Sequence, residues 1–169
     1  MNIDVFGADE QQAIVIDLET YTQLLAFALA AEGVSPPAEV NLLFVDSDTI
    51  AALNESHMGK AGPTDVLSFP IDDEPRPPGR NPDAGNAGPG GDSDEEDLRM
   101  VGDIVIAPSV AALNAVEHEV SVDEELALLV VHGALHLLGW DHMDDSEAEG
   151  MEAREQVLLR EFALLRERP

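Results

Sequence analysis

The chain has 169 residues, 44% of them hydrophobic, so it is long enough for one domain with a real hydrophobic core. It contains no cysteine, which excludes disulfide bonds and thiolate metal sites and leaves imidazole and carboxylate groups as possible metal ligands. No apolar run approaches the ~20 residues that cross a bilayer, and no basic segment followed by an apolar block opens the chain, so we expect a cytoplasmic protein.

The charge of the chain is strongly acidic. Eight Lys and Arg residues against 35 Asp and Glu residues give a formal net charge of −27 at pH 7. Such a field repels polyanions at long range, which weighs against a nucleic-acid substrate. A bound dication and a few basic side chains can still create a positive spot inside an acidic envelope, so the charge does not exclude RNA binding.

The first part of the chain alternates predicted strands and helices. Strands are predicted at 12–17, 40–45 and 64–70, an amphipathic helix at 19–32 and a short helix at 50–54. A glycine follows the long helix, where it is a typical stop signal. Acidic and serine residues precede the short helix, where they serve as caps.

Residues 72–99 interrupt this pattern. Ten of these 28 residues are Gly or Pro, nine are acidic, and almost none are large and apolar. Such a segment cannot bury enough surface to offset its ordering entropy, so we predict a disordered insertion. A lid over a site is the alternative function of such a loop.

The second part predicts one more strand and three helices. The strand spans 100–107, and Pro108 opens a helix that runs to about His118. Ser121 and Glu124 form a capping box that opens an apolar helix ending near Gly139, and a last helix starts near 145. Several connections are too short for helical crossovers, so we expect a single α+β domain over residues 1–169, with helices packed on a mixed four-stranded sheet.

Three histidines form the clearest chemical pattern. His132 and His136 are four residues apart on a helix, so their rings can point at one place. Gly139 lets the chain leave the helix sharply, which can return His142 to the same place. Three imidazoles with an open fourth position are the arrangement of catalytic zinc. We predict one divalent metal here, with zinc favoured, and Asp141 as a hydrogen-bond acceptor that orients His142.

The same spacing is found in metzincin proteases with one difference. Those enzymes place a glutamate after the first histidine, where it acts as the general base. This chain has Gly133 there, which disfavours a peptidase. The other two histidines, His57 and His118, have no such company and are predicted to be surface residues.

Residues 132–142 (His-Gly-Ala-Leu-His-Leu-Leu-Gly-Trp-Asp-His) resemble the signature of the YbeY family of bacterial rRNA maturation endoribonucleases. Residues 63–70 (Pro-Thr-Asp-Val-Leu-Ser-Phe-Pro) and 102–106 (Gly-Asp-Ile-Val-Ile) resemble two further hallmarks, and the Leu-Asn pair at 53–54 and the Glu-Leu pair at 125–126 stand where the family has them. The resemblance implies a single α+β domain in which three histidines hold zinc. It also implies single-strand-specific cleavage of RNA in 16S rRNA 3′-end processing and ribosome quality control in the cytoplasm, with the small ribosomal subunit or its proteins as partners.

The resemblance has one departure that concerns substrate contact. Family members often carry an arginine about six residues before the Thr-Asp pair, and this chain has Met58 there. Lys60 is a candidate replacement, with a solvated turn lysine as the alternative. Asp65 and Ser68 are candidates for a place beside the metal, with a turn cap and a strand hydrogen bond as the alternatives. The general base stays unassigned.

These observations leave three functions to compare. The leading one is a zinc-dependent endoribonuclease, in which either a metal-activated water or the 2′-hydroxyl of the RNA attacks the phosphodiester. The second is a metalloprotease with metzincin-like spacing. The third is a non-catalytic ribosome-assembly factor with a structural metal, which the acidic surface favours because ribosomal proteins are basic.

Overall fold

The computed structural model describes residues 3–71, 98–140 and 144–167. Residues 72–97, most of the predicted insertion, lie outside the described residues. In chain order the elements are β1 (Ile3–Asp9), α1 (Leu18–Ala31), β2 (Ala38–Phe44), α2 (Ser47–Leu53), the π-helical turn η1 (Asn54–Met58), β3 (Val66–Pro70), β4 (Arg99–Ile106), α4 (Pro108–His118), α5 (Val122–Leu137) and α6 (Asp145–Glu167). No helix in these three ranges combines the length and apolar character needed to cross a bilayer.

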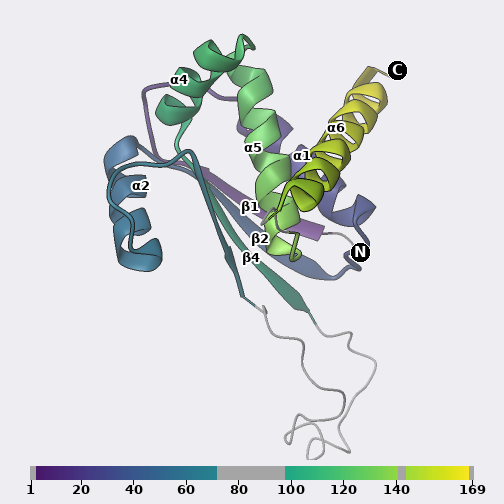
Figure 1. Cartoon of the computed structure of the whole chain (residues 1–169). Coiled ribbons are helices and arrows are strands. Elements are labelled where there is room, and N and C mark those ends of the chain that lie inside the picture. Colours follow the sequence, from purple (N-terminus) through teal and green to yellow (C-terminus); the bar gives the residue numbers. More distant parts are fainter. Residues whose placement is uncertain (1–2, 72–97, 141–143, 168–169) are drawn as a thin grey trace, which may run out of the picture.

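The four strands form one mixed sheet in the order β1-β2-β4-β3. β1 and β4 run parallel to β2, whereas β3 is antiparallel to β4. Figure 1 shows α1, α5 and α6 together on one face of this sheet, while α2 stands apart from them. The predicted α+β domain with a mixed four-stranded sheet is confirmed.

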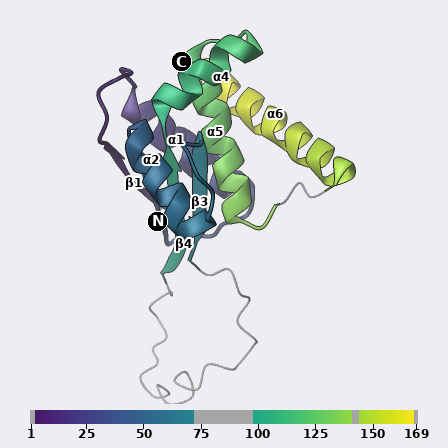
Figure 2. The same cartoon turned by 60° about the vertical axis from the view of Figure 1, so that its left-hand side comes forward.

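Side-chain alternation along the central strands assigns the layers. Leu42 of β2 and Ile104 of β4 are buried in the main core with α1 and α5. Val105, the next residue of β4, belongs to a second cluster that contains Ile50 of α2. Because successive strand residues point to opposite faces, α2 covers the face opposite to α1 and α5. Figure 2 shows α2 in front of the sheet, with α5 beyond β3.

The prediction of a first strand at 12–17 is wrong. β1 spans Ile3–Asp9 and pairs in register with β2. The apolar run that suggested a strand begins in a turn organised by Gln11, whose Nε2 donates to Asp9 Oδ1 and to Ile14 O at 2.8 Å each. Val15, within that run, is 94% exposed. A short apolar run does not by itself distinguish a strand from a connecting loop.

The short helix predicted at 50–54 begins earlier than predicted, at Ser47, and α2 ends at Leu53. Asp46 caps it, since its Oδ1 accepts a hydrogen bond from Thr49 N at 2.8 Å, and α2 begins at Ser47. The chain then continues as η1. Asn54 is buried there and donates to Gly62 O at 3.0 Å, which closes the turn that carries Lys60.

α5 approaches the sheet more closely than a larger residue would allow at two places. A Cβ atom at Gly133 would lie 2.9 Å from Ile104 Cγ2 of β4. A Cβ atom at Gly102 of β4 would lie 2.9 Å from Leu137 Cδ2, and the φ of Gly102 is 145°. These two contacts fix the distance between α5 and the sheet, because interiors have little room to yield.

The corner between α4 and α5 contains a capping box and a polar pair. The predicted capping box is present, with Glu124 N donating to Ser121 Oγ and Ser121 N donating to Glu124 Oε1. His118 is exposed as predicted, but it does have a partner, since its Nδ1 lies 2.9 Å from Oε1 of the buried Glu125. The hydrogen bond to Glu125 and the charge of that carboxylate raise the pKa of His118 above its usual value.

This pair predicts a pH-dependent contribution to stability. Because the pKa of His118 is raised on folding, the pair stabilises the fold fully below about pH 6.5, the unfolded value, and this contribution is lost as the pH rises through the folded value. Urea unfolding should therefore show that His118→Asn loses most stability relative to wild type near pH 5.5 and progressively less as the pH rises through the folded pKa of His118. In a Glu125→Gln background the pH dependence of this loss should shrink. A loss that is constant with pH would contradict the prediction.

The contact at Gly133 predicts a steric cost. Gly133→Ala should lower the free energy of unfolding by about 1–3 kcal/mol, because the new methyl group meets Ile104. Gly150→Ala is the matched control, since nothing lies within 4 Å of its Cβ position, and it should stabilise α6 by up to about 1 kcal/mol. Gly133→Ala should cost less in an Ile104→Ala background, and an unchanged cost there would contradict this account.

Candidate metal centre

α5 brings two of the three predicted ligands together. His132 and His136 are both partly buried on this helix. Their Nε2 atoms lie 3.0 Å apart, and the ring centroids are 4.5 Å apart at an interplanar angle of 79°. The i, i+4 spacing therefore points both rings at one place, as the sequence predicts.

The other nitrogen of each ring faces an oxygen atom. His132 Nδ1 lies 2.6 Å from Glu155 Oε2, and His136 Nδ1 lies 3.0 Å from the backbone oxygen of Trp140. An ionised carboxylate and a carbonyl group only accept hydrogen bonds, so the tautomer with a proton on Nδ1 satisfies both contacts. In that neutral tautomer each Nε2 carries a lone pair, and the two Nε2 atoms lie next to each other.

Two facing lone pairs fit a metal ion. Two nitrogens held at zinc distances of about 2.0–2.1 Å in a tetrahedral arrangement are about 3.3 Å apart, close to the separation of these Nε2 atoms. The chemistry of the donors fits as well, since imidazole with its Nδ1 proton held by an acceptor is the usual zinc-binding form. His132 and His136 are therefore suited to hold such an ion.

The third predicted ligand, His142, and its predicted partner Asp141 lie outside the described residues. Within the described ranges alone, no group of three or more His, Cys, Asp or Glu side chains is close enough to hold a metal ion. The described residues do include the turn by which the chain leaves α5. Gly139 has φ 97° and Trp140 N donates to Leu135 O at 3.0 Å, so the predicted glycine turn is present.

Sequence reasoning missed Glu155. This residue of α6 is only 4% exposed, and its carboxylate contacts His132 from 23 positions downstream. A signal was present, because Met151, Glu155, Leu158 and Phe162 follow the spacing of one buried helix face. A carboxylate at a core position of an amphipathic helix indicates a specific partner.

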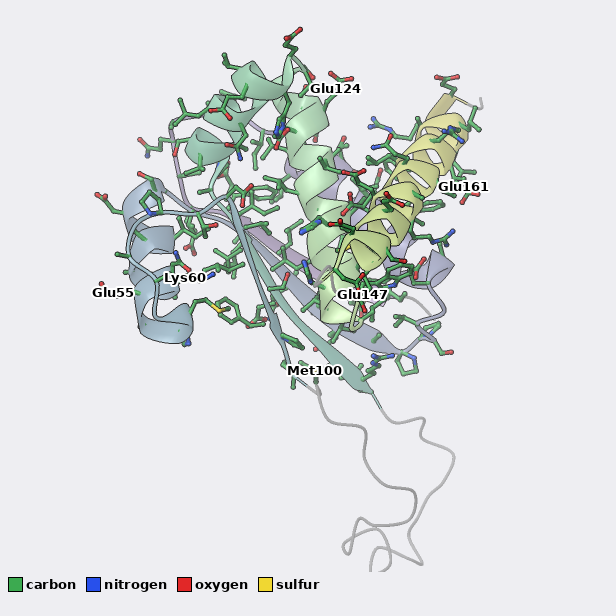
Figure 3. All side chains as sticks on the ribbon, in the orientation of Figure 1. Glu55, Lys60, Met100, Glu124, Glu147 and Glu161 are labelled. Atoms are coloured by element: carbon green, nitrogen blue, oxygen red, sulfur yellow. The ribbon has the colours of Figure 1, made fainter. Side chains whose placement is uncertain are left out.

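The two histidines line a cleft of about 710 Å³ together with all three weaker candidates. Lys60 reaches it from the turn after η1, and Figure 3 shows Lys60 beside α2. Asp65 borders the cleft ahead of β3, and its Oδ2 accepts from Asn114 Nδ2 at 3.0 Å. Ser68 of β3 also borders it and donates to Gly133 O at 3.2 Å. Met58, at the position where the resemblance predicts an arginine, lines the same cleft.

The position that carries the general base in metzincin proteases has no room for a side chain in this protein. The Cβ direction of Gly133 points at Ile104 of the sheet, so a glutamate there would collide with the core. The difference from the metzincin pattern is therefore a packing requirement of this fold as well as a missing carboxylate.

Comparisons with known proteins identify the family of this chain. The family model described as Endoribonuclease YbeY matches residues 8–163. Proteins named Endoribonuclease YbeY are 40% identical over 162 residues in Corynebacterium glutamicum (strain R), covering 96% of this chain and 76% of that protein, and 42% identical over 150 residues in Moorella thermoacetica, covering 88% of each. The solution structure of TM1509 from Thermotoga maritima matches with a TM-score of 0.57 and 27% identity, covering 95% of this chain and 88% of that one. The chain belongs to the YbeY family of endoribonucleases.

Proposed function

We propose that this protein is a zinc-dependent endoribonuclease that cuts single-stranded RNA, with His132, His136 and His142 as the metal ligands. The observation that carries the proposal is the pair of Nε2 atoms 3.0 Å apart, with acceptors on both Nδ1 atoms. The names of the relatives, which are about 40% identical over most of the chain, supply the reaction class.

In this proposal the chain supplies position and charge around the scissile phosphate. A bound zinc ion would contribute a Lewis acid that lowers the pKa of water toward ~7 and polarises a phosphoryl oxygen. Lys60, which lines the same cleft, would bind a phosphate of the RNA. Asp65, whose carboxylate is oriented by Asn114, is the proposed proton acceptor. Ser68 holds β3 against α5 through its bond to Gly133 O.

The biological role that we propose follows from the family resemblance. It is maturation of the 3′ end of 16S rRNA and ribosome quality control in the cytoplasm, with the small ribosomal subunit or its proteins as partners. The acidic chain, at −27, suits contact with basic ribosomal proteins. The same observation favours the second candidate, an assembly factor in which the metal has only a structural role. That candidate predicts a ribosome-linked function that survives the loss of the histidines.

Replacement of His136 should remove metal and activity together. His136→Ala deletes one of two facing donors, so zinc content per chain and cleavage of single-stranded RNA should both fall to background. The measurements are metal analysis and incubation with RNA, the matching DNA and casein, each with and without a chelator. Cleavage of the RNA without cleavage of the matching DNA would favour attack by the 2′-hydroxyl of the RNA.

The control for this experiment is His57→Ala, which removes an exposed histidine outside the cleft lining. It should retain zinc and activity. RNA cleavage that persists in a metal-free His136→Ala protein would sink the proposal, and cleavage of casein would move it to the protease class.

Replacement of Lys60 should weaken RNA binding in a salt-dependent way. If Lys60 neutralises one phosphate, Lys60→Met should reduce the slope of log affinity against log salt by about 0.7, the value for single strands. Fluorescence anisotropy with labelled single-stranded RNA at several salt concentrations measures this slope. Lys60→Arg keeps the charge and should keep the slope. An unchanged slope in Lys60→Met would show that Lys60 contacts solvent and not the RNA.

A further inference from the structure

α6 docks on the domain through both apolar and polar contacts. This helix has 23 residues, yet Met151, Glu155 and Leu158 are its only described residues that are buried. Phe162 adds a ring contact with Phe27 of α1 at 5.6 Å. Two consecutive residues of α6, Arg154 and Glu155, make the polar contacts that reach toward the metal centre.

Glu155 acts on the first histidine directly. Its Oε2 accepts the Nδ1 proton of His132 at 2.6 Å, and the carboxylate is buried. A buried carboxylate on Nδ1 fixes both the ring orientation and the tautomer, which leaves Nε2 as the donor atom toward a metal.

Arg154 reaches the second histidine through two further residues. Its Nε donates to Oε2 of Glu32, the residue that ends α1. Oε1 of the same carboxylate accepts from Trp140 Nε1 at 3.2 Å. The backbone oxygen of Trp140 in turn accepts from His136 Nδ1 at 3.0 Å. The indole ring and the carbonyl group belong to one residue, so holding the ring restrains the peptide that orients His136.

We propose that α6 positions both helix histidines and that zinc binding and α6 docking stabilise each other. Glu155 is the positioning residue for His132, and Arg154 is the positioning residue for His136 through Glu32 and Trp140. This inference rests on the proposed zinc site. Coupling between two equilibria is reciprocal, so whatever α6 adds to zinc affinity, zinc must add to the docking of α6.

The first test is zinc affinity of the full chain, measured by competition with a chromophoric chelator. Glu155→Leu should bind zinc about 10–100-fold more weakly, as is typical when a residue that orients a metal ligand is lost. Glu155→Gln keeps a side-chain carbonyl as an acceptor and should fall between wild type and Glu155→Leu. Arg154→Met should show a smaller loss than Glu155→Leu, because it acts through two intervening residues.

The matched controls are Arg160→Met and Glu161→Leu, which make the same changes at two consecutive exposed positions of α6. Figure 3 shows Glu161 on the outer side of this helix. Both controls should bind zinc like wild type. Urea unfolding of each metal-free variant verifies that it is folded under the assay conditions, so a purely structural loss cannot lower the measured affinity.

The second test is hydrogen exchange of residues 150–162 of α6. Zinc should slow exchange there in wild type, and this effect should disappear in the Arg154→Met/Glu155→Leu double variant. Wild-type zinc affinity in Glu155→Leu, or no effect of zinc on exchange in wild type, would overturn the inference while leaving the zinc site intact. A wild-type protein that binds no zinc would overturn both proposals.

Discussion

The close contact between α5 and β4 is the constraint on which the site depends. Gly133 lies against Ile104, and Leu137 lies against Gly102, so one i, i+4 pair of α5 faces the sheet. The preceding positions, His132 and His136, form the neighbouring i, i+4 pair, rotated by about 100° around the helix. Packing the first pair on the sheet therefore turns the second pair toward the cleft. A larger residue at position 133 would move the helix and both rings with it.

The two histidines are held from different parts of the chain. Glu155 comes from α6, and the carbonyl of Trp140 comes from the turn that ends α5. Ser68 of β3 bonds to the backbone of α5 between the two histidines. Because each contact comes from a different element, the orientation of the two rings depends on how α6, β3 and the turn after α5 pack around α5. Such support from surrounding groups is what keeps a metal site in one geometry.

The sequence predicts those features that depend on local spacing. The pairing of His132 with His136, the capping box at Ser121 and the turn at Gly139 all follow from helix geometry and appear in the structure. The mixed sheet follows from the short connections. The place of the first strand did not follow, because the apolar run at 12–17 was as compatible with a strand as with the loop that it forms.

The contacts that support the site depend on long-range packing instead. Glu32 and Trp140 are 108 positions apart, and no local pattern connects them. His118 and Glu125 are seven positions apart on two different helices, so their distance depends on the corner between α4 and α5. Glu155 is the intermediate case. Its place on a buried helix face is visible in the sequence, but its partner His132 becomes evident only when α6 docks on α5.

The acidic charge of the chain and an RNA substrate are compatible because they act at different distances. At physiological ionic strength, charges more than about 8 Å apart in solvent are largely screened. The net charge of −27 therefore bears mainly on how RNA approaches the protein. Contact within the cleft depends on the groups that line it. Among the described lining residues Lys60 is the one lysine or arginine, and the same cleft is lined by a pair of imidazole groups suited to a dication. With a dication bound, Lys60 and the ion would together form a local positive site, and a short-range attraction of this kind can hold a phosphate despite the acidic charge of the chain.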